Sequence, residues 1–204
     1  MGKYNYIIAI TGKSSSGKDS IGRVLSNQYG YKYVVSTTTR PSRSNETNHI
    51  DYHFITESEF QKLIDNNELI EYRYYDTIEQ GEKTRWHYGI ERKEINLDEH
   101  SYVCVVDLVG LEDLKREFGY KVISLYIDVP EEVRRIRAIV RDRYFEEGEF
   151  TRRCKDDDIK FANVQNVIDT IVRNDNFNEC LASVLHFIKK TTEKRTFFTQ
   201  YASW

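Results

Sequence analysis

The segment from Gly12 to Lys18 holds residues whose types and spacing suit phosphate binding. It has the pattern G-x-x-x-x-G-K. In such a loop the glycines let the backbone approach an anion, the N–H groups point inward, and the lysine adds a positive charge. We therefore expect the phosphates of a nucleotide to be bound by Gly12, Ser14, Ser15, Ser16, Gly17 and Lys18.

The sequence around this loop is typical of a strand, a turn and a helix. Residues 6–10 form a short apolar run that indicates a buried strand. Residues 20–28 carry Ile21, Val24 and Leu25 at helical spacing. The phosphate-binding pattern requires this context, because the dipole of the following helix adds positive potential where the phosphates lie.

Composition bounds the class of protein. The 204 residues suffice for one α/β domain with a small insertion. The 30 Lys and Arg residues against 33 Asp and Glu give a net charge of −3, so no global basic excess favours a nucleic-acid partner. Cys104, Cys154 and Cys180 lack metal-ligand spacing, which indicates reduced thiols. With no room for a signal peptide and no apolar run of membrane-spanning length, we expect a cytoplasmic protein without a membrane partner.

A second candidate anion site follows the strand-like run at residues 31–35. The segment Ser36-Thr37-Thr38-Thr39-Arg40-Pro41-Ser42-Arg43 sets two arginines after the four consecutive hydroxyl groups of residues 36–39. Its proline and hydroxyl residues favour a loop, and arginines bind phosphate oxygens well. These residues alone predict either an anion clamp or a solvated basic turn.

The next elements indicate an inserted lobe. Residues 51–55 alternate like a strand, and Thr56 with Glu59 forms a capping box at the start of a helix that ends near Asn66. Residues 69–72 resume an extended pattern. Short strands around one helix are too small to form their own core.

Three segments that follow the loop in order give the chain a family resemblance. They are residues 36–43, Asp51-Tyr52-x-Phe54 and Asn67-Glu68-Leu69-Ile70-Glu71-Tyr72. Together they resemble guanylate kinase over residues 6–190. The resemblance implies an α/β fold of the P-loop nucleoside monophosphate kinase type, with a parallel sheet flanked by helices. It also implies one domain over residues 1–190 and a tail at 191–204. Within the domain we expect a core at about 1–35 and 100–190, a GMP-binding lobe at about 36–95 and an arginine-rich lid at about 137–155.

The matching positions imply roles in the acceptor lobe. Arg40, Arg43 and Tyr52 are expected to hold the GMP phosphate, while Ser36 and Glu71 are expected to read the guanine. A carboxylate can accept both N1–H and N2–H₂ of guanine, a donor pair that adenine lacks. Without its neighbours, Glu71 would instead be interpreted as an exposed residue on a small sheet.

The segment after Tyr72 departs from the family. In the family this segment is a shorter hairpin that ends in Tyr-Tyr-Gly. His87-Tyr88-Gly89 matches that ending, which implies Tyr88 as a phosphate contact. Tyr74-Tyr75 is a rival alignment that lacks the glycine. The extra residues 76–86 are charged and predict a protruding loop. Ile90 stands where the family has serine or threonine near the base, which leaves one guanine contact in doubt.

Residues 102–107 form an apolar run that ends in Asp107. Ligands bind at this end of strands in open parallel sheets. Asp107 matches the second acid of the family's Asp-Ile-Asp segment, and Val105 replaces the first acid. Asp107 is thus a candidate for contacting the base or orienting a metal-bound water. The alternative is a helix cap. A helix at 111–118 and a buried strand at 121–127 follow.

The helix after Pro130 is rich in arginine, which usually indicates a solvated face. At this place the segment resembles the lid that closes over ATP. The family's Arg-x-x-x-Arg pattern fits Arg137 and Arg141, and its later lid arginine fits Arg153, or Arg152 with a one-residue slip. Residues 146–149 are predicted to form a mobile acidic turn between them.

The remaining residues predict a helix at 161–168, a strand and turn at 170–175 and a closing helix at 180–188. Asn174 resembles the family asparagine near the adenine. The tail carries Phe197, Phe198, Tyr201 and Trp204, which could pack on the domain or on another subunit.

A magnesium contact is expected just after the loop. Asp19 stands where serine or threonine usually binds the metal, and Ser20 follows it. Some nucleoside monophosphate kinases carry the hydroxyl at the later position, so the resemblance implies Ser20 as the contact to Mg²⁺ through water. Asp19 would suit the helix dipole or orient a metal-bound water.

The resemblance implies that ATP donates its γ-phosphoryl group to GMP, and to dGMP, with Mg²⁺ as cofactor. Lys18 and the lid arginines 137, 141 and 153 would then stabilise the transferring group. The alternatives are a nucleoside monophosphate kinase for another base and a silent binding module. The expected partners are small-molecule nucleotides, without nucleic acid or membrane, and the chain is expected to be a monomer or homodimer.

Overall fold

A five-stranded parallel sheet forms the core of the protein. The computed structural model describes residues 4–43, 46–79, 82–141 and 145–201. The strands lie in the order β2-β7-β1-β8-β9, with β1 at Ile7–Thr11, β2 at Lys32–Tyr33, β7 at Tyr102–Val105, β8 at Val122–Asp128 and β9 at Thr170–Arg173. The expected α/β architecture with a parallel sheet is confirmed. Its three central strands, β7, β1 and β8, are largely apolar and buried, as in a parallel sheet that helices cover on both faces.

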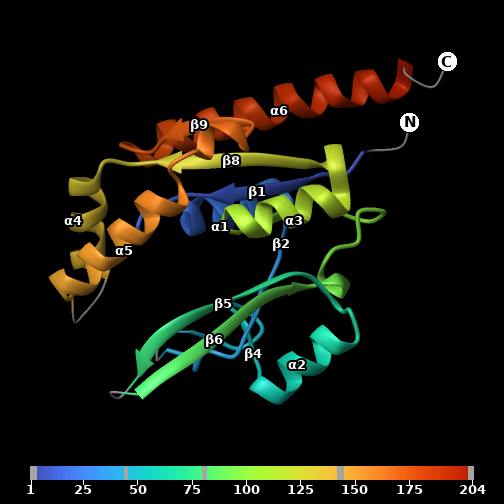
Figure 1. Ribbon diagram of the computed structural model, residues 1–204. Coiled ribbons are helices and arrows are strands. Elements are labelled where there is room, and N and C mark those ends of the chain that lie inside the picture. The colour runs from blue at the N-terminus through green and yellow to red at the C-terminus, as the bar shows by residue number, and fades with distance from the viewer. Residues whose placement is uncertain (1–3, 44–45, 80–81, 142–144, 202–204) are drawn as a thin grey trace.

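Helices cover both faces of this sheet. Alternate residues of β1 divide the core: Ile8 and Ile10 pack with α1 (Lys18–Tyr29) and α6 (Phe177–Tyr201), whereas Ile7 and Ala9 pack with α3 (Leu108–Phe118). Figure 1 shows α6 running along one side of the sheet. The carboxyl end of β1 therefore delivers the phosphate-binding loop directly to the amino end of α1.

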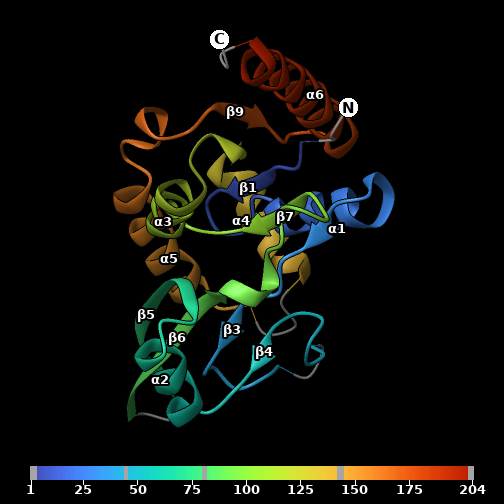
Figure 2. The same ribbon diagram turned by 90° about the vertical axis from the view of Figure 1, so that its right-hand side faces the viewer.

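A smaller sheet forms a separate lobe (Figures 1 and 2). Its strands lie in the order β4-β3-β6-β5, with β3 at Thr37–Thr38, β4 at His53–Phe54, β5 at Leu69–Glu79 and β6 at Glu82–Glu91. Helix α2 (Glu57–Asp65) begins with the predicted capping box, in which Thr56 and Glu59 bond each other's backbone N–H. Buried Phe60 is the residue of α2 that packs most completely on the lobe.

Two helices at the far end of the core carry the arginine-rich segment. They are α4 (Glu131–Arg141) and α5 (Glu147–Lys160), and Ala138, Phe150 and Cys154 form their small shared core. Short 3₁₀ turns lie at Arg92–Glu94, Gly119–Lys121 and Val164–Asn166. Among the described helices, none combines the length and apolar composition that crossing a membrane demands.

The predicted loop at residues 76–86 is wrong. Strands β5 and β6 continue as an antiparallel hairpin, with Asp76 opposite Arg85 and Glu79 opposite Glu82. Pairing satisfies the backbone N–H and C=O groups that a protruding loop would leave to water. The insertion is therefore a regular extension of the lobe's sheet.

The predicted acidic turn at 146–149 and helix at 161–168 are also wrong. Helix α5 already begins at Glu147, because Glu147 and Glu149 in its first turn suit the helix dipole and pair with arginines of the two helices. Residues 161–168 contain only the 3₁₀ turn at 164–166 within an irregular segment. Phe161 and Val164 pack on Tyr126, which accounts for their three-residue spacing without an α-helix.

The boundary expected at residue 190 falls inside one helix. Helix α6 runs without a break to Tyr201, and Arg195 donates to the carbonyl oxygen of Val122 at 2.7 Å. Tyr6 and Thr196 share a hydrogen bond at 3.2 Å. The described part of the tail therefore docks on its own core, and Phe197, in the same helix, is 58% exposed. Trp204 lies outside the described residues.

Candidate functional site

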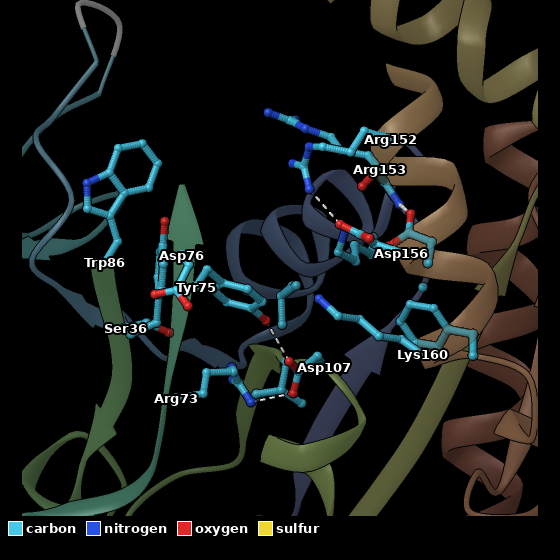
Figure 3. A pocket seen from close by; sticks show the side chains of 18 of the residues that line it. Ser36, Arg73, Tyr75, Asp76, Trp86, Asp107, Arg152, Arg153, Asp156 and Lys160 are labelled. Carbon is cyan, nitrogen blue, oxygen red and sulfur yellow. Dashed lines mark hydrogen bonds and ion pairs between the residues drawn. The ribbon is translucent and has the colours of Figure 1, made fainter. Parts of the chain in front are cut away.

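One cavity lies between the core sheet, the lobe and α5. It has a volume of about 450 Å³, and its walls include residues predicted to bind ATP as well as residues predicted to bind GMP. The predicted residues that line it are Gly12, Ser14, Lys18, Ser36, Arg43, Tyr52, Glu71, Tyr88, Asp107 and Arg153. Figure 3 shows the side chains of β5 and β6 facing those of α5 across this space. The tertiary structure thus brings together residues separated by more than a hundred positions.

The phosphate loop has the backbone shape that its glycines allow. Gly17 caps α1 with a φ of 88°, in the left-handed region that favours glycine. A Cβ there would stand 2.6 Å from the side-chain nitrogen of Asn174, so residue 17 must be glycine for steric reasons as well. Ser15 also has a positive φ, 61°.

Residues from remote elements hold this loop from behind. Asn174, expected near the adenine, is buried and donates to the carbonyl oxygen of Ser16 at 2.8 Å. Arg137 donates to the same oxygen at 3.2 Å and to the carbonyl oxygen of Asn174 at 2.7 Å. The sequence interpretation missed Arg134, whose buried guanidinium lies 3.4 Å from the carbonyl oxygen of Ser14.

Two carboxylates of α5 bind the loop, and sequence reasoning missed both. Asp157 accepts the backbone N–H of Ser14 at 2.7 Å, and Asp158 pairs with Lys13. Arg134 lies 3.9 Å from the Asp157 carboxylate. An N–H group suited to a phosphate therefore bonds an acid of the chain itself. The run Asp156-Asp157-Asp158 was the available signal, but its spacing alone does not show which acid reaches the loop.

The arginine clamp converges on another internal carboxylate. Arg40 is buried and binds Glu46 at 2.8 Å, and the backbone N–H of Arg43 donates to the same carboxylate at 2.8 Å. These bonds outweigh burial and hold the pKa of Glu46 below its usual value. The guanidinium of Arg40 also lies over the ring of Tyr52 at 5.3 Å. Arg40 is therefore not a solvated side chain, whereas the side chain of Arg43 is 60% exposed.

Tyrosines complete the wall beside the clamp. Tyr52 and Tyr88 make an edge contact with ring centroids 6.1 Å apart, and Tyr75 meets Tyr88 at 5.5 Å. Burial, helped by the charge of Asp19, raises the pKa of Tyr52 to about 12, so its hydroxyl remains a neutral donor at physiological pH.

A charged cluster lies where β5 meets the amino end of α3. Glu71 of β5 is buried, and the guanidinium of Arg73 approaches its Oε2 to 3.1 Å. Asp107 caps α3 by accepting the N–H of Gly110 at 3.0 Å, binds Arg73 and accepts from the Tyr75 hydroxyl at 2.7 Å. Figure 3 shows Arg73 and Tyr75 both pointing at Asp107. The helix-cap alternative for Asp107 is confirmed.

Comparison with known proteins agrees with this geometry. The family model described as guanylate kinase matches residues 4–191. The chain belongs to the guanylate kinase family. The guanylate kinase of Bacteroides thetaiotaomicron is 28% identical over 200 residues, covering 92% of this chain and 90% of that protein. That of Malacoplasma penetrans is also 28% identical, over 199 residues, covering 95% of this chain and 97% of that protein.

A solved structure shares the fold. The crystal structure of guanylate kinase from Anaplasma phagocytophilum superposes with a TM-score of 0.68 at 22% identity, covering 93% of this chain and 87% of that chain. The expected P-loop nucleoside monophosphate kinase fold is therefore confirmed. The activity of this guanylate kinase family member is the ATP-dependent phosphorylation of GMP to GDP, and its substrates are nucleotides.

Several residues matched to the family pattern lie outside the described cavity lining. Ser20 and Asp19 are exposed on the first turn of α1, and Arg141 is exposed at the end of α4. Ile90, at a position where the resemblance implies serine or threonine, is fully buried in the core. Ser15, Ser16, Gly17, Arg40, Arg137 and Asn174 lie behind or beside the cavity rather than in its lining.

The cavity also holds residues that the family pattern did not indicate. Lys160 of α5 lies over the ring of Tyr75 at 4.5 Å, so α5 and the lobe meet there. Trp86 of β6 lines the wall, and its indole N–H has no hydrogen-bond partner within the described part of the chain. Arg152 and then Arg153 lower the pKa of Glu149 to about 2 through hydrogen bonds. These residues share the lining with Arg73 and Asp157.

Proposed function

We propose that this kinase activity takes place in the single cavity described above, with ATP at the phosphate loop and GMP at the lobe. The observation that carries the assignment is the shared lining: Lys18 of the loop, Arg43 and Glu71 of the lobe and Arg153 of α5 all face one space. Transfer between two nucleotides requires both to be held in line within one water-excluding site.

On the donor side, the backbone N–H groups of residues 12–18 bind the ATP phosphates and Lys18 neutralises their charge. Arg153 stabilises the transferring group from α5, while Arg137 positions the loop through the carbonyl oxygen of Ser16. Arg141 and Asn174 complete the donor side in this proposal. No general base is required, because the acceptor is already an anionic phosphate oxygen.

On the acceptor side, Arg40, Arg43, Tyr52 and Tyr88 bind the GMP phosphate. Arg40 and the backbone N–H of Arg43 both bind the Glu46 carboxylate, which is negatively charged like the GMP phosphate. This shared contact supports the role, because the same donors suit a phosphate. Glu71 and Ser36 read the guanine, with Glu71 accepting N1–H and N2–H₂. Asp107 holds Arg73 and Tyr75 in place on this side of the cavity.

Magnesium is the proposed cofactor. The described residues contain no group of three acidic, histidine or cysteine side chains that could hold a metal ion. A nucleotide-bound Mg²⁺ needs only one or two protein oxygens beside phosphates and waters, which the Ser20 hydroxyl and the Asp19 carboxylate can supply. When bound, the ion would neutralise charge on the phosphates.

The proposal assigns residues 36–95 to the acceptor lobe and residues 137–155 to the lid, both hinged on a core at 1–35 and 100–190. The separate sheet of the lobe supports this division. Three free, buried cysteines support a reducing compartment such as the cytoplasm. We further assign the chain no nucleic-acid or membrane partner and a monomeric or homodimeric state.

Phosphorylation rates across GMP, dGMP, AMP, UMP and dTMP, with ATP and Mg²⁺, test the assignment. We expect turnover of GMP and dGMP far above that of the other three. Faster turnover of another base would favour a kinase of different specificity, and lack of turnover together with no thermal shift by ATP would favour a silent binding module.

A further inference from the structure

Glu71 occupies an environment that disfavours its charge. Its side chain is 1% exposed, and none of the described residues donates a hydrogen bond to its Oε2, because the nearby guanidinium of Arg73 lies within ion-pair distance but not in hydrogen-bonding geometry. Burial dominates and raises the pKa of Glu71 to about 7. The carboxyl group therefore lies close to the boundary between its two protonation states.

The two protonation states read different bases. An ionised Glu71 accepts both N1–H and N2–H₂ of guanine. A protonated Glu71 presents an O–H donor, which opposes guanine N1–H but complements the N1 acceptor and the N6 amino group of adenine. Whatever keeps Glu71 ionised therefore maintains guanine selectivity.

The charged and titratable groups around Glu71 come from three elements. Asp107 and Asp113 of α3 oppose its ionisation, and the buried thiol of Cys104 on β7 faces it as a neutral group. On β5 itself, the pKa of Tyr75 is raised by burial, which keeps this side chain neutral as well. Arg73 is the positive charge that counters the acids, at 3.1 Å from Oε2.

The position of Arg73 is built by its surroundings. Its guanidinium is anchored on Asp107, which is itself held by the N–H of Gly110 and the hydroxyl of Tyr75. A Cβ on residue 110 would stand 2.6 to 3.1 Å from the guanidinium atoms, so Gly110 leaves the space that Arg73 fills. The side chain is only 15% exposed, which limits screening of its charge by water.

We propose that Arg73 is a positioning residue for base selection, which holds the buried Glu71 in the ionised form that recognises guanine. The inference rests on the proposed role of Glu71 in reading the base. Asp107 then acts through Arg73 rather than on the base, because its carboxylate oxygens already accept from Arg73, Tyr75 and Gly110.

The test is the pH dependence of kcat/KM for GMP and for AMP between pH 6 and 8.5 in Arg73→Met and Arg73→Lys. Each value is divided by that of the unmodified protein at the same pH, which cancels titration of the nucleotide phosphates. We expect Arg73→Met to lose roughly tenfold on GMP at pH 6.5, because raising the Glu71 pKa by one unit cuts the ionised fraction about tenfold. The loss should shrink as the pH rises, the GMP-to-AMP ratio should fall most at low pH, and Arg73→Lys should restore much of the loss.

Two further variants keep the test decisive. Gly110→Ala leaves Arg73 in the chain but displaces its guanidinium, so it should reproduce the pH-dependent loss even if Arg73→Met folds poorly. Arg85→Met is the matched control, since Arg85 is another hairpin arginine paired with an acid, Asp76, but exposed. Its pH profile should follow that of the unmodified protein.

A loss that is equal at every pH in Arg73→Met and Gly110→Ala would overturn the inference and assign Arg73 a purely structural role. Tighter GMP binding in Arg73→Met would also overturn it, because Arg73 would then obstruct the base. Failure of the unmodified protein to phosphorylate GMP would instead refute the proposed function, so the two failures are distinguishable.

Discussion

The donor and acceptor halves of the cavity differ in how their charges are arranged. In the donor half, a cationic loop bonds an acid from a distant helix, Asp157, at a backbone N–H suited to phosphate. In the acceptor half, a buried acid, Glu71, forms an ion pair with Arg73, which favours its ionised form. In the proposed function the donor half reads phosphate charge, which every nucleotide carries, whereas the acceptor half reads the hydrogen-bonding pattern of one base. Three variants test this difference between the two halves.

The largest effect is expected from Lys18→Ala in the donor half. The substitution removes the positive charge that the loop offers to the transferring phosphoryl group, so kcat should fall on the order of 10²–10³-fold with GMP as acceptor. Steady-state kinetics at saturating ATP would measure it.

The comparison variant is Lys13→Ala on the same loop. Lys13 pairs with Asp158 and is not among the described residues that line the cavity, so its loss should be far smaller. Equal losses in the two variants would show that the loop acts through its general charge rather than through Lys18.

The next effect is expected from Glu71→Gln in the acceptor half. The amide keeps one acceptor but opposes the second guanine donor with its own N–H₂, so kcat/KM for GMP should fall about 10- to 100-fold, as for loss of a charged hydrogen bond. A competition assay with AMP should show reduced discrimination. Unchanged selectivity would remove Glu71 from base recognition.

Stability provides the control for this variant. The pKa of Glu71 in the folded protein, about 7, lies above the 4.5 of an unperturbed glutamate. The protonated group thus favours folding fully below that unperturbed pKa, and this contribution is lost as the pH rises through about 7. Melting curves of the ligand-free protein should therefore show Glu71→Gln gaining Tm, relative to the unmodified protein, as the pH rises from 5 to 8.

The smallest effect is expected from Asp157→Asn in the donor half. Weakening the bond to the Ser14 N–H frees a phosphate-binding group and removes a negative charge beside the loop. ATP should then bind about 3- to 10-fold more tightly, equivalent to one hydrogen bond, as measured by calorimetry without GMP. The neighbouring Asp156, which pairs with Arg152, provides the control Asp156→Asn. Weaker ATP binding in Asp157→Asn would show that Asp157 organises the loop instead of competing for it.

Local patterns predicted much of the fold. The loop between a buried strand and a helix, the capping box at Thr56 and the cap at Asp107 all depend on residues within a few positions of one another. The errors lie where pairing at a distance decides. The hairpin at 76–86 exists because each strand satisfies the other's backbone. Helix α6 continues past residue 190, where Arg195 bonds Val122 of β8 and Thr196 bonds Tyr6.

The phosphate loop and the motifs of the family resemblance could be recognised in the sequence, because each consists of residues close together in the chain. Which charges meet across the chain depends on the tertiary structure. Arg134 resembles its arginine neighbours in sequence and differs from them by burial beside the loop. Arg73 and Gly110 match no motif in the sequence, yet Gly110 leaves the space in which Arg73 pairs with both Glu71 and Asp107. The physical reason is that ionisation in a buried site depends on the full set of neighbouring charges, which folding alone brings within a few ångströms.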